Sequence, residues 1–250
     1  METTYIYGKH AVLDAVSKRP DLVLSVFTKA EHMEDQTVAK VLGKMENLYE
    51  LNERKLPQGV FKDAVHQGFI ASIDANKLLI PFKEFKSGLK VNADTAVAVL
   101  GELEDPHNVG AIIRSAAAFG LYAVLLPERR QTQITGTVIK TSAGTAFSIP
   151  LVSIKNVNSA IRDLKEIGFW VYGLDMEGDV KVTEEKFEKP TVFVVGNEGR
   201  GLREKTGKHC DNILTIPIHK RAESLNASVS AGVVFSHWSE KHSDPIKFGS

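Results

Sequence analysis

Cysteine is almost absent from this sequence, which has a single cysteine, Cys210, among 250 residues. One cysteine cannot form a disulfide within the chain, and a reducing compartment suits such a protein. Long apolar runs are also missing, because no stretch approaches the roughly 20 residues that a membrane helix needs. The first ten residues, METTYIYGKH, lack the basic and then apolar pattern of a signal peptide. These absences predict a cytoplasmic protein without a membrane span.

An excess of charge of one sign is missing as well. The chain has 31 lysine and arginine residues against 31 aspartate and glutamate residues, and its formal net charge is zero. This balance excludes a uniformly basic nucleic-acid-binding protein, but it leaves room for a local basic patch. The short clusters that could form one are Arg129-Arg130 and Lys220-Arg221.

Several motifs that define common enzyme classes do not occur. No Gly-Lys-Ser/Thr follows a glycine-rich loop, which excludes a P-loop, and no G-x-G-x-x-G supports a dinucleotide-dependent oxidoreductase. The lack of G-x-S-x-G argues against an α/β-hydrolase. The histidines show no paired spacing, and Cys210 beside His209 offers too few converging ligands for a metal. The sequence therefore predicts no metal site.

The composition is that of a globular protein, with 43% hydrophobic and 25% charged residues. Short strand and helix patterns predict a small α/β domain over residues 1–75. Residues 76–95 contain turn formers and four lysines, and they are typical of a linker, although part of the segment is apolar enough to pack. Residues 96–242 are expected to form a larger domain, and residues 243–250 a loose tail.

The larger domain is predicted to be a parallel α/β sheet. The continuous apolar run Ala96–Leu100 is typical of a strand that is covered on both faces. Later strand patterns alternate with helical patterns, which indicates parallel order. These strands are expected at 122–126, 149–152, 169–174, 191–195 and 213–218. Because ligands of such sheets bind beyond the carboxyl ends of the strands, the loops that follow them are where a site is expected.

The first of these loops begins a helix with the sequence D-P-H-N-V-G, residues 105–110. Asp105 or Asn108 can cap this helix by accepting backbone hydrogen bonds. Arg114 then interrupts a helix that is otherwise small and apolar, and a guanidinium there needs an acid, a phosphate or a polar cavity. An arginine that forms an ion pair at the helix edge is the ordinary alternative, and the residue type alone favours it.

Two further loops carry unusual sequences. Residues 196–201, G-N-E-G-R-G, follow a buried strand, and their glycines allow backbone groups to approach a ligand. Residues 224–228, S-L-N-A-S, begin a helix rich in small residues, which Ser224 or Asn226 can cap. Taken alone, a tight turn explains the second loop and an ordinary cap explains the third.

In this order, the three loops resemble the motifs of the SpoU/TrmH family of RNA ribose 2′-O-methyltransferases, in the SPOUT superfamily. The shared pattern is D-P-x-N-x-G-x-x-x-R, then G-N-E-x-x-G-L, then S-L-N-x-S, within residues 96–240. Residues 7–12 and 66–68 are similar to the RNA-recognition domain of the branch that methylates a guanosine ribose in bacterial 23S rRNA. The resemblance implies an S-adenosylmethionine-dependent RNA 2′-O-methyltransferase whose N-terminal domain binds the RNA substrate.

The resemblance also implies a fold, an assembly and a site. The fold is a parallel-sheet methyltransferase domain whose C-terminal end is threaded into a trefoil knot. Family members are homodimers whose active site borrows residues across the interface. The catalytic residues that it implies are Asn108, Arg114, Glu198, Ser224 and Asn226. The residues that it implies for the methyl donor are Thr141, Ser142, Ala143, Gly144, Gly196, Asn197, Glu198, Gly199, Gly201, Ile216, Ile218, Ser224, Leu225 and Asn226.

The expected RNA contacts are the loop cations Arg129, Arg130, Lys220 and Arg221, because a phosphate backbone needs such charges. For any one of them, a solvated surface charge is the ordinary alternative.

Three questions stay open at the level of sequence. A tRNA ribose methyltransferase of the same family would share the chemistry, but its usual form lacks a domain like residues 1–75. A non-catalytic RNA-binding assembly factor could use the same fold, although the intact motifs speak against it. Arg114 is the family's proposed activator of the ribose hydroxyl, but arginine normally stays protonated, so Glu198 or water could accept the proton instead.

Overall fold

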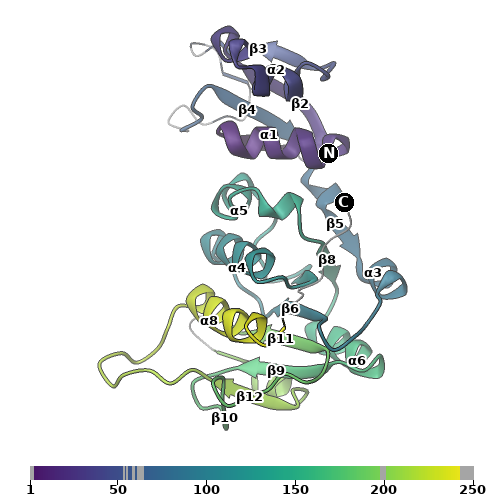
Figure 1. Ribbon diagram of the computed structural model, residues 1–250, viewed down its shortest axis with the longest axis vertical. Coiled ribbons are helices and arrows are strands. Elements are labelled where there is room, and N and C mark those ends of the chain that lie inside the picture. The colour runs from purple at the N-terminus through teal and green to yellow at the C-terminus, as the bar shows by residue number, and fades with distance from the viewer. Residues whose placement is uncertain are drawn as a thin grey trace.

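The computed structural model describes residues 3–52, 54, 56, 57, 60, 65–197 and 201–242. A small N-terminal unit and a larger C-terminal unit follow one another along the chain (Figure 1). The small unit has a four-stranded sheet with the order β1-β4-β2-β3, in which β2 and β3 are parallel and the other pairs antiparallel. Its elements are β1 (Thr4–Tyr7), α1 (Lys9–Lys18), β2 (Val23–Thr28), α2 (Gln36–Leu42), β3 (Leu48–Glu50) and β4 (Phe69–Ile73).

The larger unit is built on an eight-stranded sheet with the order β10-β12-β9-β11-β6-β7-β8-β5. Every pair in it is parallel, which confirms the predicted fold class. Its strands are β5 (Leu79–Pro81), β6 (Ala96–Leu100), β7 (Ala123–Pro127), β8 (Leu151–Ile154), β9 (Trp170–Leu174), β10 (Val180–Lys181), β11 (Thr191–Val195) and β12 (Asn212–Thr215). Its helices are α3 (Phe82–Gly88), α4 (Pro106–Ala118), α5 (Gly136–Thr141), α6 (Val157–Glu166), α7 (Glu204–Gly207) and α8 (Ala227–Ser239). Short 3₁₀ turns, η1 to η4, lie at Pro20–Leu22, Ala30–Glu34, Ala75–Leu78 and Thr145–Phe147.

Strand β6 shows why its sequence is apolar throughout. All five residues of the strand are buried. Ala96, Ala98 and Leu100 belong to one hydrophobic cluster, whereas Val97 and Val99 belong to a second. Because successive side chains of a strand point to opposite faces, the two clusters are the two sides of the sheet. Helices α4 and α8 cover one face, and α3 and α6 cover the other (Figure 1).

The segment expected to be a linker is instead largely structured. Strand β5 pairs with β8 and so forms the edge of the large sheet. Leu78 and Phe85 are both buried in hydrophobic clusters. Residues 79–88 are therefore part of the larger unit, because their apolar side chains gain more from packing than from a solvated tether. The tail, residues 243–250, lies outside the described residues.

The two units are packed against each other through α5. A Cβ atom added to Gly136 would lie 2.2 Å from the carbonyl oxygen of Tyr5 in β1. Gly144 has a φ of +80° and lies so close to α1 that an added Cβ would be 2.5 Å from Asp14 Oδ2. Glycine at Gly136 lets the backbones of α5 and β1 meet, and glycine at Gly144 leaves room for the Asp14 side chain.

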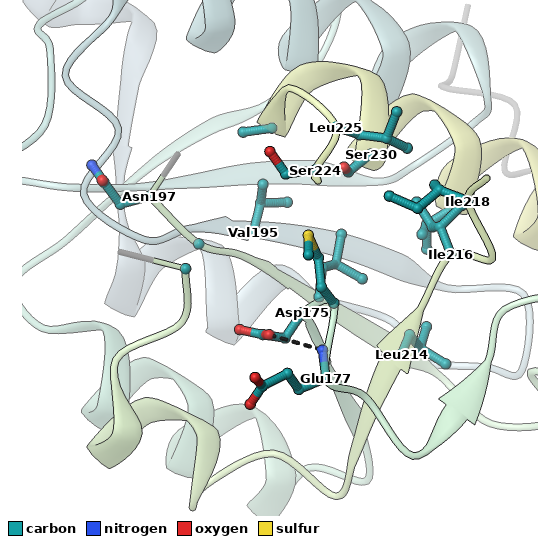
Figure 2. Close-up of a pocket in the computed structure, with 16 residues that line it drawn as sticks. Asp175, Glu177, Val195, Asn197, Leu214, Ile216, Ile218, Ser224, Leu225 and Ser230 are labelled. Atoms are coloured by element: carbon teal, nitrogen blue, oxygen red, sulfur yellow. Dashed lines mark hydrogen bonds between the residues drawn. The ribbon is translucent and has the colours of Figure 1, made fainter. Parts of the chain in front are cut away.

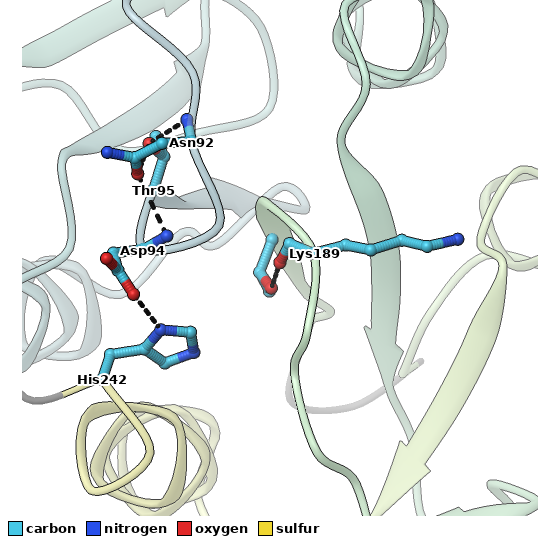
Figure 3. A network of polar contacts seen from close by, with 6 residues as sticks. Asn92, Asp94, Thr95, Lys189 and His242 are labelled. Carbon is cyan, nitrogen blue, oxygen red and sulfur yellow. Dashed lines mark hydrogen bonds and ion pairs between the residues drawn. The ribbon is translucent and has the colours of Figure 1, made fainter.

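Both ends of α8 are held by polar contacts. At its start, Asn226 Oδ1 accepts hydrogen bonds from the backbone N–H groups of Ser228 (2.8 Å) and Val229 (3.3 Å). At its end, the ring of His242 stacks on the buried ring of Trp238, with 4.5 Å between ring centroids. His242 Nδ1 lies 2.7 Å from Asp94 Oδ1, in the turn just before β6 (Figure 3). The predicted threading of this C-terminal segment into a knot stays a prediction.

Candidate functional site

A cavity of about 430 Å³ lies at the carboxyl ends of β9, β11 and β12 (Figure 2). Leu174, Val195 and Leu214, at or near the ends of these strands, line it together with Val234 of α8, and all of them except the half-buried Leu174 are buried. This is the edge at which ligands of parallel sheets bind, and the volume is in the range of small-molecule sites, about 300–1,000 Å³. The other residues that line it are Asp175, Met176, Glu177, Gly196, Asn197, Gly201, Ile216, Ile218, Ser224, Leu225, Ala227 and Ser230.

The glycine loop forms one wall of this cavity and is closed by its own backbone. Asn197 N–H donates to the carbonyl of Gly201 (3.1 Å), and Gly201 N–H donates to the carbonyl of Asn197 (2.8 Å). Gly201 has a φ of +61°, and a Cβ atom on Gly196 would lie 2.5 Å from the carbonyl carbon of Gly201. Glycine is therefore required at Gly196 by close approach and favoured at Gly201 by its backbone angle.

The first and third sequence motifs meet through two asparagines. Asn226 Nδ2 donates to Asn108 Oδ1 (2.9 Å), and Asn108 Nδ2 donates to Asp105 Oδ2 (3.1 Å). Asp105 also caps α4 by accepting the backbone N–H of His107 (2.8 Å). Asn108 is buried, so this chain of hydrogen bonds fixes the starts of α4 and α8 relative to each other.

Arg114 does not join this cluster within one chain. It lies six residues beyond Asn108 on α4, which is about 9 Å along a helix axis, and its side chain is exposed and outside the cavity. Within the described parts of the chain, Arg114 forms neither a hydrogen bond nor an ion pair. The expectation of an ion pair at the helix edge is therefore not met, and neither is a polar cavity around Arg114 inside the single chain.

The predicted donor residues fall into four groups, of which the last, Thr141–Gly144, lies away from the cavity. Seven of them line the cavity: Gly196, Asn197, Gly201, Ile216, Ile218, Ser224 and Leu225. Asn226 lies directly beside it as the cap of α8. Glu198 and Gly199, with Arg200, lie outside the described residues.

The stretch Thr141–Gly144 does not border the cavity in the single chain. Thr141 Oγ1 lies 3.4 Å from His107 Nδ1, and a Cβ on Gly110 would lie 2.7 Å from Thr141 Cβ. Ser142 is fully buried and donates to the carbonyl of Ile139 (2.8 Å). The small side chains here allow α4, α5 and α1 to pack closely, which is a structural reason for this composition.

Sequence analysis missed the loop that follows β9. Asp175, Met176 and Glu177 line the cavity, and they directly follow a strand that was predicted correctly. Asp175 Oδ1 accepts the backbone N–H of Glu177 (3.2 Å), as Figure 2 shows. The rule that ligands bind beyond strand ends was the signal that could have identified this loop.

The four predicted RNA contacts separate into two pairs. Arg129 and Arg130 are exposed in the loop after β7 and line a second cavity of about 730 Å³. This second cavity shares Gly196, Asn197 and Gly201 with the first. Lys220 and Arg221 are exposed in the long loop before α8 and line neither cavity (Figure 1).

Burial raises the pKa of the Cys210 thiol to about 12, so the reactive thiolate is disfavoured. Among the residues that the structure describes, no cluster of metal-ligating side chains occurs. Within the same residues, no helix is long and apolar enough to cross a lipid bilayer.

Fold and site together define a two-unit α/β protein with a small-molecule cavity at the strand ends of a parallel sheet. Residues 95–236 match the SpoU rRNA Methylase family, and residues 5–79 match the family described as RNA 2′-O ribose methyltransferase substrate binding. The chain belongs to the SpoU rRNA methylase family. It is 34% identical over 235 residues to the 23S rRNA (guanosine-2′-O-)-methyltransferase RlmB of Neisseria meningitidis, covering 92% of each chain.

Solved structures show the same fold along nearly the whole chain. The AdoMet-bound rRNA methyltransferase of Sinorhizobium meliloti has a TM-score of 0.77 at 21% identity, covering 96% of this chain and 88% of that chain. The SpoU methyltransferase AviRb of Streptomyces viridochromogenes, in complex with the cofactor AdoMet, has a TM-score of 0.78 at 20% identity. That comparison covers 97% of this chain and 91% of AviRb.

Proposed function

We propose that this protein transfers a methyl group from S-adenosylmethionine to a ribose 2′-hydroxyl of RNA, and that the target is a guanosine of 23S rRNA. One observation carries the proposal: residues of the second and third family motifs line one cavity. The first motif is linked to this cavity by the hydrogen bond between Asn108 and Asn226. The 34% identity to an RlmB enzyme supports the guanosine of 23S rRNA as target. A substrate in the ribosome implies a cytoplasmic protein.

The cavity suits S-adenosylmethionine in size and in chemistry. Leucine, isoleucine and valine side chains provide an apolar surface for an adenine ring, and the glycine loop offers backbone groups. By resemblance to the family, Gly196, Ile216 and Leu225 contact adenine or ribose. Asn197, Gly201, Ile218 and Ser224 complete the wall around them. The bound donor supplies an electrophilic methyl group on a positively charged sulfur.

The side chains of the protein align the acceptor and stabilise its charge. Asn108 and Asn226 form a rigid hydrogen-bonded pair beside the cavity, and Ser224 lies on its wall. A guanidinium stays protonated in proteins, so Arg114 would act as a cation that binds phosphate or a developing alkoxide. Glu198, which lies outside the described residues, stays a proposed catalytic and donor-binding residue, and Gly199 a proposed donor-binding residue. Thr141–Gly144 would contact the donor only if a partner subunit or a shift of α5 brought them there.

A homodimer would bring Arg114 to a site. A groove lies between α4 and α8, and Val229 on its wall is 49% exposed. The residues that line it are Ser115, Phe119, Ser228, Val229, Gly232, Val233, Ser236 and His237. Small residues allow another helix to come close, and Arg114 directly precedes Ser115. These features support a symmetric dimer in which Arg114 of one subunit reaches the cavity of the other.

The N-terminal unit favours rRNA over tRNA as the substrate. Its match to an RNA 2′-O ribose methyltransferase substrate-binding family supports a role in choosing the RNA. A tRNA enzyme of the usual form has no such unit, which leaves the tRNA alternative with less support. A non-catalytic RNA-binding factor would not need the donor cavity.

The test of this function is methyl transfer to RNA. Purified full-length protein is incubated with isotopically labelled S-adenosylmethionine and either protein-free 23S rRNA or tRNA, and the modified nucleotide is mapped. We expect label in one ribose 2′-O-methylguanosine of 23S rRNA. Label only in tRNA would establish the alternative substrate, and binding of RNA without any label would establish the non-catalytic factor.

A prediction about donor selectivity arises from the charges of the cavity. Asp175 and Glu177 are the charged side chains among its described lining residues, and both lie on the side opposite to Ser224 and Ser230 (Figure 2). Glu177→Gln should weaken binding of S-adenosylmethionine by about three- to fivefold, because an exposed carboxylate attracts a cation by up to about 1 kcal/mol. S-adenosylhomocysteine, which lacks the sulfonium charge, should lose less affinity.

Isothermal titration calorimetry with both ligands checks this prediction. Glu166→Gln on the exposed face of α6 makes the same chemical change outside the cavity and should leave both affinities as they are. If Glu177→Gln lowered the affinity for both ligands equally, the charge of Glu177 would not be the reason for its contribution to donor binding.

A further inference from the structure

The second cavity lies on the other side of the glycine loop from the donor cavity. It extends over the carboxyl ends of β6, β7 and β8, and its volume of about 730 Å³ exceeds that of the first. Three loops contribute to it, with Glu102 after β6, Arg129 after β7 and Lys155 after β8. Because β11 lies between β9 and β6 in the sheet, the two cavities meet beyond the end of β11, where Gly196, Asn197 and Gly201 line both.

The charged groups of this second cavity favour an anion. Arg129, Arg130 and Lys155 are exposed, and none forms an ion pair or hydrogen bond with the described residues. Arg203 is paired with Glu102, which leaves Glu104 as the opposing carboxylate of the lining. Three cations against one carboxylate, close together at one sheet edge, give a locally positive surface on a chain that is neutral as a whole.

The start of α6 adds backbone donors to the same surface. Asn156, Val157 and Asn158 all line the cavity, and α6 is ten residues long. Asn156 Oδ1 accepts the N–H of Ser159 (3.0 Å), so the N–H groups of Val157 and Asn158 are the first-turn donors that this cap does not use. Amides at a helix start and adjacent cations together suit phosphate oxygens.

From these observations we propose that the second cavity binds the ribose–phosphate backbone of the RNA strand next to the methylated nucleotide, with Lys155 and the start of α6 as contacts. The inference rests on the proposed function and adds a location for the substrate strand. A single phosphate would fill only a small part of 730 Å³, whereas a stretch of backbone would occupy it. An RNA strand that leaves this cavity past Gly196, Asn197 and Gly201 reaches the donor cavity directly, because these three residues line both.

Charge reversal at Lys155 tests the proposal in the full-length protein. Affinity for a 23S rRNA fragment that contains the methylated site is measured at several salt concentrations between about 50 and 200 mM. Over this range, the loss of affinity with salt reports the number of phosphate contacts. Lys155→Glu should lower RNA affinity by about tenfold and reduce the slope of log K against log salt by about 1. Affinity for S-adenosylmethionine should not change, because Lys155 does not line the donor cavity.

Lys186→Glu is the matched control. Lys186 is exposed and precedes β11, so it lies at the amino ends of the strands, the opposite edge of the sheet. RNA affinity in Lys155→Glu that equals the wild type, or an equal loss in Lys186→Glu, would overturn the proposal. Binding of inorganic phosphate that Lys155→Glu abolishes while RNA binding persists would assign the cavity to a small anion and would also overturn it. Labelled methyl transfer by the wild type to the same fragment tests the proposed function separately, since it does not depend on Lys155.

Discussion

Replacing Arg114 with alanine is expected to lower the rate of RNA methylation by at least about 100-fold while the melting temperature stays close to that of the wild type. Removal of one preorganised group that stabilises transition-state charge costs about 10²–10³ in rate. Stability should be spared because Arg114 is exposed and makes no hydrogen bond or ion pair with the residues described. Single-turnover methylation and thermal unfolding measure the two quantities.

A surface arginine on another helix provides the control for this variant. Arg162 on α6 is exposed, and its Nη2 donates to Ser159 Oγ (3.2 Å), so Arg162→Ala removes the same side chain outside both cavities. It should methylate RNA at nearly the wild-type rate. Near-normal turnover by Arg114→Ala would remove Arg114 from the mechanism.

Gly196→Ala is expected to weaken donor binding strongly. The new Cβ would lie 2.5–2.7 Å from the backbone of Gly201 and Leu202, which is shorter than any tolerated contact. The backbone of Gly201 and Leu202 must then move, and the two hydrogen bonds between Asn197 and Gly201 are lost or distorted. We expect S-adenosylmethionine affinity to fall by at least about 30-fold, since steric clashes in a packed region cost about 1–3 kcal/mol and more.

Gly88→Ala separates this steric effect from the general effect of replacing a glycine. No atom lies within 4 Å of the position of a Cβ on Gly88, so donor affinity should be unchanged in that variant. Calorimetric titration of the donor and the melting temperature of both variants are compared. Wild-type affinity in Gly196→Ala would mean that the glycine loop does not shape the donor site.

The two variants can be combined to show whether Arg114 acts across a dimer. An Arg114→Ala chain retains its cavity, and a Gly196→Ala chain retains its arginine. If Arg114 serves the partner's cavity, random mixing makes about half of the dimers mixed, and each mixed dimer has one complete site, formed by the cavity of the Arg114→Ala chain and the arginine of the other chain. The mixture would then contain roughly a quarter of the working sites of the wild type. If Arg114 serves its own chain, mixing restores no activity.

The sequence predicted the parts of the fold whose interactions are local or periodic. The run Ala96–Leu100 is apolar because both of its faces are covered, and this pattern can be read without knowing the neighbours. The glycine loop was predicted to approach a ligand, and Gly196 and Gly201 do line the cavity. The starts of α4 and α8 were each predicted to have one of two caps, and the residues found there, Asp105 and Asn226, are among those candidates, because a cap depends on residues only two or three positions away.

What the sequence did not predict depends on contacts between distant segments. Strand β5 became an edge of the large sheet because β8, some 70 residues away, offered an unpaired side. The composition of Thr141–Gly144 reflects close packing against Gly110 and Asp14, which no local pattern encodes. The exposure of Arg114 follows from which face of α4 meets the sheet. The loop at Asp175–Glu177 carries no motif, so only its place after β9 identifies it.

The anchoring of α8 at both ends has a practical consequence. The helix lines the donor cavity through Ala227, Ser230 and Val234, while His242, just beyond its last turn, is bonded to Asp94 in the segment before β6. A truncation that removes His242 would remove the contact with Asp94 that holds the C-terminal end of α8. We expect it to lower the affinity for the donor, because residues of the same helix line the donor cavity. Expression boundaries and affinity tags should therefore leave the helix and its terminal histidine intact, even though that histidine lies outside the cavity it helps to shape.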